Sequence, residues 1–543
     1  YMQTYMAHRN DFGGANSVYV SVCDKQGNIF NPEFFDTLKD VHDQLFFING
    51  VDRSLVVSLF SPSTRFTEIV EGGFAGGPVI PADFDSKNPQ ALEKVAANIE
   101  KANIVGGLAR TIEYKNCKYD IGPHRFYTLN KEVNNFYKNI LGTDSINVKR
   151  LTRIFYDKKY FYYPLSPFNT LFNLGLTKAL KILSSYFFSK IKSINKSYKI
   201  SNFEDWVILN FGSELYKTFF KSYTEKVWGI ECKYISKDWA AQRIKNISFF
   251  NVFFNSIIKK LTNKKVKSLV DSFQYPKHGA GFFYKKLSNI IIENGGKIEL
   301  NSELTKINHS NNKIENIIIK TDNEELKIES DTYIFSNPFT EIVEKLNPKP
   351  PKNILEACSK LKYRHHIGVK LEIHGSIFED NWIYVHDPRV KMARVSNYKN
   401  FSPYMSNSTN KNPVTVEYFC FENDKIWKLN DQEIISFAIS ELKLSGIIND
   451  SNSVENSFIV RSLNAYPVIA KDYEKHVLVV KNYLNHFSNL YPIGRSGMFK
   501  YNNQDHAIAT GMYMARNLID ENFDIDIWNI NSEGVYVEGE IKY

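Results

Sequence analysis

The segment around Gly106 and Gly107 combines glycines with charged side chains at a spacing that suits a phosphorylated ligand. Arg110 and Thr111 follow the two glycines, and Glu100 lies six residues before Gly106. Glycines allow close approach of the backbone, an arginine presents a fork of donors to phosphate, and a carboxylate can accept hydrogen bonds from ribose hydroxyls. Taken alone, the segment is a weak signal for such a ligand.

A second candidate segment is Tyr119–Phe126, in which Gly122 and Pro123 precede His124. A histidine on a glycine-proline turn can be aimed at a ligand. For an isolated histidine, the alternative is a side chain whose hydrogen bonds are satisfied within its own loop.

A third segment lies near the C-terminus and leads into a helix predicted at residues 512–519. A helix amino terminus presents free amides and the positive end of the helix dipole, which suits a pyrophosphate. The residues of this segment with candidate roles are Gly494, Arg495, Gly497, Tyr501 and Asp505.

Together these segments resemble the flavin-containing amine oxidase and protoporphyrinogen oxidase superfamily. The resemblance implies an FAD cofactor that accepts the hydride, so the sequence names no catalytic base and no metal ligand. It also implies which residues contact FAD, namely Glu100, Gly106, Gly107, Arg110, Thr111, Gly122, His124, Gly494, Arg495, Gly497 and Asp505.

The resemblance implies an α/β fold, here an incomplete FAD-binding Rossmann-like domain with a mixed sheet and a helical cap. The expected flavin-binding parts are residues 105–165, 270–345 and 485–520, the cap is 166–269, and the substrate-domain sheet is 346–484. Within the second flavin part we expect a helix at 282–294 and a strand at 297–300, before a strand pair that ends near residue 338.

The segment from Tyr223 to Gly229, with the Gly-Pro-His turn, resembles UDP-galactopyranose mutases, which carry out a redox-neutral reaction with reduced FAD. That likeness implies a nucleotide-sugar substrate and four substrate-binding residues, Tyr223, Trp228, Arg243 and Tyr501. Ile247, Phe499 and Asn503 depart from the mutase pattern. Segments at Asp387-Pro388 and 465–468 instead resemble amine-oxidase-like flavoproteins whose substrates are poorly defined, so an FAD-dependent oxidoreductase is the first expectation.

Residues 1–110 differ from the rest of the chain in charge. They carry nine Lys or Arg and thirteen Asp or Glu, a net of −4, whereas the remaining residues carry a net of +13. Residues 1–104 resemble part of a periplasmic porter subdomain of RND-family exporters. Three sequence segments carry this resemblance, residues 27–35, 50–53 and 74–77. This implies a small α+β fragment with strands at 17–22 and 51–60 around a helix at 32–47. Since the exporter's membrane helices are absent, a transport-associated protein with a cofactor-free scaffold is only an alternative.

The G-x-G-x-x-G motif that opens dinucleotide-binding domains occurs nowhere in the sequence. The glycines at 72–77 have the wrong spacing and precede two prolines, so we expect a turn there rather than a phosphate loop. The sequence of residues 98–106 is compatible with both the RND exporters and the flavin superfamily. This is expected for a chimera whose two parts are joined at that point. FAD binding is therefore expected to be weak or absent.

The bulk composition excludes several function classes. Five widely spaced cysteines indicate neither a disulfide framework nor a zinc site. Polar residues interrupt the most apolar stretch, 168–191, so no transmembrane segment is expected. The net charge of +9 comes with no nucleic-acid-binding motif. We expect a small-molecule substrate and a cytoplasmic flavin region, with association to a membrane surface as an alternative, whereas the N-terminal fragment resembles a periplasmic domain. The sequence indicates no oligomeric state.

Overall fold

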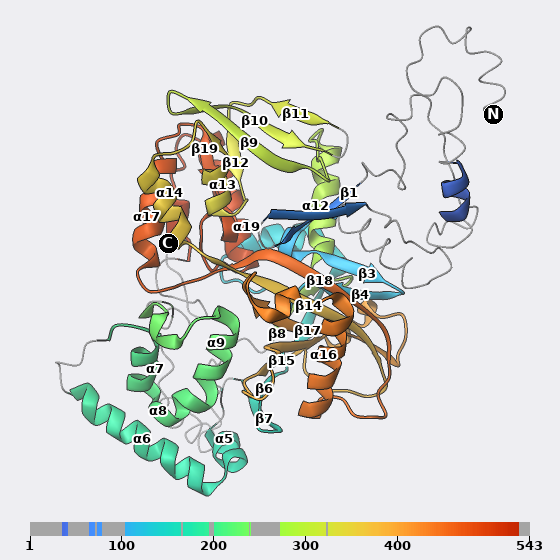
Figure 1. Cartoon of the computed structure of the whole chain (residues 1–543), viewed down its shortest axis with the longest axis vertical. Helices are drawn as coiled ribbons and strands as arrows, with labels where there is room; N and C mark the ends of the chain where they lie inside the picture. The colour runs from blue at the N-terminus through green and yellow to red at the C-terminus, as the bar shows by residue number, and fades with distance from the viewer. Residues whose placement is uncertain are drawn as a thin grey trace. The chain divides into compact units, whose positions relative to one another are not determined.

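The computed structural model describes residues 35–41, 65–70, 73–78, 104–163, 165, 167–194, 200–237, 239, 272–321 and 324–531. Backbone contacts divide the chain into two compact units, Tyr1–Ile104 and Val105–Tyr543. Each unit is described by itself (Figure 1).

The first unit contains a helix at residues 35–41, within the predicted helix, and a hairpin of β1 (Arg65–Val70) and β2 (Gly73–Pro78). The glycine-rich turn predicted at 72–77 is wrong, because Gly73–Pro78 pairs along its whole length with β1. This backbone pairing outweighs the low strand propensity of glycine. The strands predicted at 17–22 and 51–60 lie outside the described residues.

The second unit is built around a seven-stranded sheet that is parallel at one pairing, β15–β6, and antiparallel elsewhere. Helix α16 (Asp431–Ser445) packs Ile434, Ala438 and Leu442 against the aliphatic side chains of this sheet. The mixed strands and helices confirm the predicted α/β class. In sheet order the strands are β18 (Val454–Pro467), β14 (Tyr363–His374), β17 (Lys411–Cys420), β16 (Arg394–Asn397), β15 (Trp382–Val385), β6 (Thr152–Tyr156) and β7 (Lys159–Tyr162).

Strands β6 and β7 differ from the predicted assignment, which placed residues up to 165 with the flavin-binding parts. They extend the large sheet instead, because β6 pairs with β15 in parallel and β7 closes a hairpin on β6. Residue pairing between segments so distant in the chain leaves no periodicity signal in either segment.

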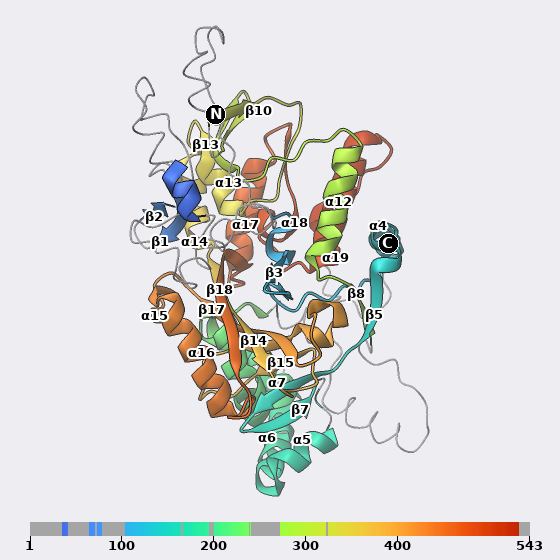
Figure 2. The ribbon, with the colours of Figure 1, turned by 90° about the vertical axis from the view of Figure 1, so that its right-hand side faces the viewer.

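The predicted flavin-binding parts come together from three regions of the chain. Strand β12 pairs in parallel with β19, β5 pairs antiparallel with β8, and helices α4, α12 and α19 share one apolar cluster (Figure 2). The bounds are β3 (Thr111–Tyr114), β4 (Cys117–Asp120), α4 (Lys131–Leu141), β5 (Ser145–Lys149), β8 (Ser272–Pro276), α12 (Gly281–Glu293), β12 (Tyr333–Phe335), β19 (Leu490–Pro492), α18 (Gly494–Gly497) and α19 (Gln504–Ile519).

Two local predictions in this region are wrong. The C-terminal helix begins at Gln504 rather than at residue 512, because Asn503 ends the preceding extended segment and its N–H donates to Nδ1 of His506. Residues 297–300 form no strand, and the strand pair begins at β9 (Glu303–Ser310) with β10 (Lys313–Lys320). The predicted helix at 282–294 agrees with α12 to within one residue at each end.

A smaller sheet packs against three helices in the second unit. Strand β10 lies between β9 and β11 (Glu325–Ile328), and β13 (Leu346–Asn347) pairs with β9. Helices α13 (Phe339–Lys345), α14 (Lys352–Lys360) and α17 (Tyr473–Leu484) bury apolar side chains against this layer.

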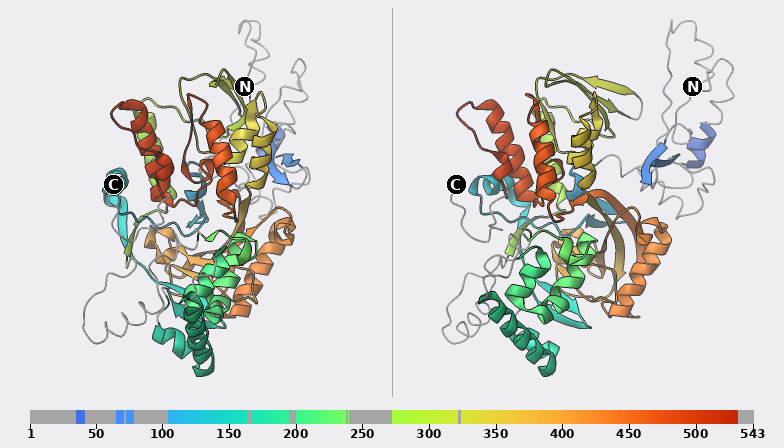
Figure 3. Two further views of the ribbon diagram at one scale, coloured as in Figure 1. Left: turned by 90° about the vertical axis from the view of Figure 1, so that its left-hand side faces the viewer. Right: turned by 60° about the vertical axis from the view of Figure 1, so that its left-hand side comes forward.

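The region predicted as a helical cap contains α5 (Pro167–Leu174), α6 (Leu176–Ile194), α7 (Phe203–Phe211), α8 (Ser213–Leu215) and α9 (Ser222–Trp228). These helices cluster at one end of the second unit, with α5 and α6 outermost (Figure 3). In the described segments, no helix is both long enough and apolar enough to cross a membrane.

Candidate active site

The candidate site begins where β4 ends at Asp120, just before the Gly122-Pro123-His124 turn. The Asp120 carboxylate is fully buried and accepts hydrogen bonds from Thr111 Oγ1 at 2.6 Å and from the hydroxyl of Tyr275 at 2.7 Å. The amide of Ala280, at the start of α12, donates to it at 3.0 Å. Burial raises the pKa of Asp120 to about 6, although these donors oppose the shift. The carboxylate therefore ties three segments to the base of the turn.

Lys370 of β14 fixes the backbone of the same turn. Its Nζ donates to the carbonyl oxygens of Asp120 at 2.5 Å and Ile121 at 3.2 Å, and to Thr415 Oγ1 at 3.0 Å. The side chain is fully buried, and burial lowers its pKa to about 7. The hydroxyl of Tyr398 also donates to the Asp120 carbonyl, at 2.8 Å. These bonds make the turn a rigid extension of the large sheet.

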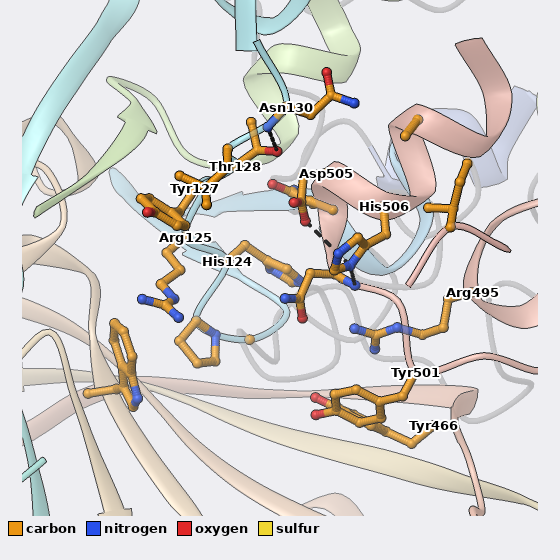
Figure 4. Close-up of a pocket in the computed structure, with 18 of the residues that line it drawn as sticks. His124, Arg125, Tyr127, Thr128, Asn130, Tyr466, Arg495, Tyr501, Asp505 and His506 are labelled. Atoms are coloured by element: carbon orange, nitrogen blue, oxygen red, sulfur yellow. Dashed lines mark hydrogen bonds and ion pairs between the residues drawn. The ribbon is translucent and has the colours of Figure 1, made fainter. Parts of the chain in front are cut away.

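The turn opens into a cavity of about 190 Å³ whose other wall is formed by α18, α19 and the end of β18. Figure 4 shows the side chains that line it. Those with polar or aromatic groups are His124, Arg125, Tyr127, Thr128, Asn130, Trp382, Tyr384, Arg394, Tyr466, Arg495, Tyr501, Asn503, Gln504, Asp505 and His506.

His124 is neutral in this setting. Burial, followed by the positive charge of Arg495, lowers its pKa to about 3. Its Nδ1 is buried and has no hydrogen-bond partner among the described residues. An unpaired buried nitrogen costs free energy unless a ligand or water supplies a partner, so this atom marks a contact point within the cavity.

One wall of the cavity is an ion-paired network on β14, β16 and β17. Arg394 donates to the Glu417 carboxylate from Nε at 3.1 Å and from Nη2 at 2.5 Å, and His366 Nε2 lies 3.0 Å from Glu417. Glu417 is fully buried; burial alone would raise its pKa, but Arg394 and His366 lower the pKa to about 2. Arg394 also donates to the hydroxyl of Tyr466 at 3.2 Å. The network therefore holds a tyrosine hydroxyl at the cavity surface.

Arg495 contributes a second positive charge. Its Nε donates to the Asn502 carbonyl at 2.7 Å and its Nη1 to the Ala465 carbonyl at 3.3 Å, and in the described part of the chain no carboxylate pairs with it. Its guanidinium lies 4.9 Å from the ring centre of Tyr466 and 5.3 Å from that of Tyr501. The two rings lie together beneath it in Figure 4. This charge remains available to an anionic ligand.

Five of the residues singled out in the sequence line the cavity, namely Gly122, His124, Arg495, Tyr501 and Asp505. Trp228 lies behind it, with its ring centre 5.6 Å from that of Tyr501, and Tyr223 stacks on His386 at 4.6 Å. Glu100 and Arg243 lie outside the described residues.

The remaining predicted residues hold backbone positions around the cavity. Thr111 Oγ1 accepts from the Gly281 amide at 2.8 Å while it donates to Asp120, so its hydroxyl is used within the protein. Gly497 is buried, and a Cβ there would lie 2.7 Å from the Phe335 carbonyl. Gly106 and Arg110 flank a short 3-10 helix that begins at Gly107, and Gly494 is the first residue of α18.

Sequence reasoning missed Arg394, Glu417, His366 and Lys370. They lie on β14, β16 and β17, and strand pairing brings Arg394 and His366 to Glu417 and Lys370 to Thr415. A charged residue within an otherwise apolar strand could have indicated a buried ion pair, because buried charges are rare unless they are paired.

The sequence predicted no metal site. Among the described residues, Glu372, His374 and Glu455 lie close enough for one ion to bridge them, but Lys411 already pairs with Glu372 at 2.5 Å and with Glu455 at 2.8 Å. We assign no metal to this cluster.

Comparison with known proteins identifies the family. Residues 99–482, more than half of the chain, match the family described as flavin-containing amine oxidoreductase. The chain belongs to this family.

Solved structures share the fold of this chain. A reduced UDP-galactopyranose mutase matches with a TM-score of 0.68 and 15% identity, over 80% of this chain and 90% of that one. A protein provisionally assigned as a protoporphyrinogen oxidase from Exiguobacterium sp. 255-15 matches with a TM-score of 0.56 and 13% identity, over 77% of this chain and 91% of that one. An oxidoreductase from Methanosarcina mazei matches with a TM-score of 0.51 and 14% identity, over 76% and 92%. At these identities the comparison establishes the fold.

The cavity and its surroundings fit the flavin that this amine oxidoreductase family binds. Gly107 and Gly494 have positive φ angles of 54° and 77°, and the space that a Cβ would occupy is open at both. The Nε of Arg110 is buried without a hydrogen-bond partner in the described residues, as is Nδ1 of His124. Open glycine turns and buried nitrogen atoms without partners suit a bound dinucleotide.

Proposed function

We propose that this chain is an FAD-dependent oxidoreductase of the amine oxidase and protoporphyrinogen oxidase-like type, acting on a small molecule in the His124–Arg495 cavity. The observation that carries the proposal is the convergence of the Gly122–His124 turn and the Gly494–Asp505 segment on one cavity, in a chain of this family.

Each part of the site has a role in this proposal. When bound, FAD supplies hydride acceptance. The phosphates of FAD would lie close to the backbone at Gly106, Gly107 and Gly494, and Arg110 would balance their charge. His124 would offer a neutral ring nitrogen to the cofactor. Arg495, with which no described carboxylate pairs, favours a negative group on the bound FAD or on the substrate. Arg394 is already paired with Glu417 and holds the Tyr466 hydroxyl toward the substrate. No residue is assigned as the base.

Anaerobic spectroscopy of the FAD-loaded chain tests this function. A substrate of the proposed class, offered from a panel of primary amines and of carboxylated analogues, should bleach the oxidised flavin absorbance. Replacement of Arg495 by methionine should weaken the response to the carboxylated compounds and leave reduction by dithionite unchanged. A chain that binds no FAD at saturating concentration would contradict the proposal.

We also propose that this chain binds FAD weakly. No G-x-G-x-x-G motif is present to supply amides to the pyrophosphate, and each missing hydrogen bond is worth roughly 1 to 3 kcal/mol. The chain should purify largely colourless, and addition of a G-x-G-x-x-G strand and helix before Glu100 should restore yellow protein. Stoichiometric FAD retained through dialysis by the unmodified chain would contradict this.

A mutase-like, redox-neutral reaction on a nucleotide sugar is the second candidate. It is supported by the likeness to UDP-galactopyranose mutase and by the contact of Trp228 with Tyr501 beside two arginines. Incubation of the dithionite-reduced, FAD-loaded chain with UDP-galactopyranose distinguishes the candidates, because only the mutase reaction gives a ring-contracted isomer with no net oxidation.

A third possibility is non-enzymatic. In it, residues 1–104 are an RND porter fragment fused to a cofactor-free scaffold. The charge difference between the segments supports a chimera. The flavin region would then be cytoplasmic and the fragment derived from a periplasmic domain. The encoding DNA across residues 95–110 tests the junction.

A further inference from the structure

Helix α6 exposes an apolar stripe on the side that faces away from the protein. Leu176, Leu180, Leu183, Phe187 and Ile191 follow one another at intervals of three or four residues, so they lie on one face of the helix. Their exposed fractions are 77%, 58%, 38%, 65% and 49%. Large side chains this exposed, in one continuous row, indicate a binding surface rather than scattered surface residues.

The opposite face of α6 anchors the helix. Ala179, Ile182, Tyr186 and Ser189 are buried, and Ile182 and Tyr186 belong to the apolar core that the cap helices share. The outer stripe is therefore held in a fixed orientation by packing on the inner face.

Aromatic side chains extend the stripe beyond α6. Phe172 of α5 is 92% exposed, and Tyr162 and Tyr163 at the end of β7 are also exposed, while Phe188 widens the stripe on α6 itself and is 64% exposed. Helices α5 and α6 meet at the outer end of the second unit in Figures 1 and 3. We name α5, α6 and Tyr162–Tyr163 the outer cap surface.

Charge decides which partner fits the outer cap surface. Residues 158–203 contain no aspartate or glutamate, and they contain eight lysines, of which Lys181 and Lys192 are exposed on α6. In a symmetric contact with a second copy, lysines would meet lysines with no carboxylate to balance them. An anionic phospholipid surface supplies the missing charge and also accepts apolar and aromatic side chains at its interface.

We propose that the outer cap surface docks this chain in the plane of an anionic lipid bilayer. The α6 helix lies along the interface, its leucines and phenylalanines enter the boundary between headgroups and acyl chains, and its lysines contact lipid phosphates. This docking is independent of the reaction performed in the cavity.

Vesicle flotation with the full chain tests the proposal. The chain should float with phosphatidylcholine vesicles that contain phosphatidylglycerol, and much less with phosphatidylcholine alone. Leu180→Ser with Phe187→Ser should lower the partition coefficient by about tenfold or more. Lys181→Gln with Lys192→Gln should reduce the preference for anionic vesicles.

A matched control is the pair Ile292→Ser and Ile519→Ser, which removes side chains that are 57% and 84% exposed on α12 and α19. This variant should float as the parent does, and circular dichroism should show that all variants are folded. Absence of flotation of the parent with anionic vesicles would overturn the proposal, as would undiminished flotation of Leu180→Ser with Phe187→Ser. A parent that is dimeric without vesicles, and becomes monomeric only in that variant, would assign the surface to a second copy instead.

Discussion

Lys370 Nζ donates to the carbonyl oxygen of Asp120 at 2.5 Å, and this bond joins β14 of the large sheet to the turn that carries His124. The two residues are far apart in the sequence and belong to different sheets. The position of His124 in the cavity therefore depends on a lysine that does not line the cavity.

Replacement of Lys370 by methionine should destabilise the protein by about 2 kcal/mol or more, because three buried hydrogen bonds are lost and the Asp120 carbonyl keeps only the Tyr398 hydroxyl as a side-chain donor. Urea denaturation measures this. Lys352→Met, at a fully solvated position of α14, is the control and should leave the midpoint unchanged. Equal midpoints for both variants would mean that the buried lysine does not fix the turn.

His124 should make the protein sensitive to acid. Its folded-state pKa of about 3 lies below the ordinary 6.5, so its contribution to stability is complete above pH 6.5 and is lost as the pH falls toward 3. By pH 5 the loss is on the order of 2 kcal/mol. The variant His124→Gln should lose less stability than the parent between pH 6.5 and 5 in chemical denaturation.

Part of the acid sensitivity should remain in His124→Gln, because burial also lowers the pKa of His386 to about 3. His486→Gln, on an exposed residue, serves as the control and should follow the parent. A stability profile of His124→Gln that overlays the parent's would contradict the assignment of a neutral His124.

Glu417→Gln should cost about 3 to 5 kcal/mol of stability, because it leaves Arg394 buried without its carboxylate partner. The double variant Glu417→Met with Arg394→Met should recover much of this loss, since it removes both charges. Thermal and urea unfolding of the two variants provide the comparison. If the single and double variants were equally unstable, the loss would come from packing rather than from an unpaired charge.

The substitutions Gly281→Ala and Gly511→Ala should shift the stability of the protein in opposite directions. A Cβ on Gly281 would lie 2.4 Å from the Thr111 amide nitrogen, so Gly281→Ala must displace backbone and should cost about 2 kcal/mol. A Cβ on Gly511, in the middle of α19, meets only Ile493 Cδ1 at 3.8 Å, so Gly511→Ala should stabilise the protein by up to about 1 kcal/mol. Melting temperatures that moved in the same direction would refute the described contact of α12 with β3.

The local sequence predicts those parts of the site that are formed by short, continuous segments. Glycine, proline and charged residues predict the Gly122–His124 turn and the Gly494–Asp505 segment as ligand contacts. The structure brings both to one cavity. The ion pair of Arg394 and Glu417 could not be predicted from the sequence, because it depends on the register between β16 and β17. The sequence prediction starts this helix at residue 512, whereas α19 begins at Gln504 and contains Gly511, because a helix tolerates one glycine at modest cost.

Equilibrium titration of FAD into the purified chain, followed by flavin fluorescence, tests most directly that the His124–Arg495 cavity belongs to a flavin site. The parent should show weak but saturable one-to-one binding, and His124→Ala should bind about tenfold less tightly because a buried partner is lost. His486→Ala should bind as the parent does. Binding of FAD by the parent and His124→Ala with equal affinity, or no saturable binding by the parent, would contradict the flavin assignment of this cavity.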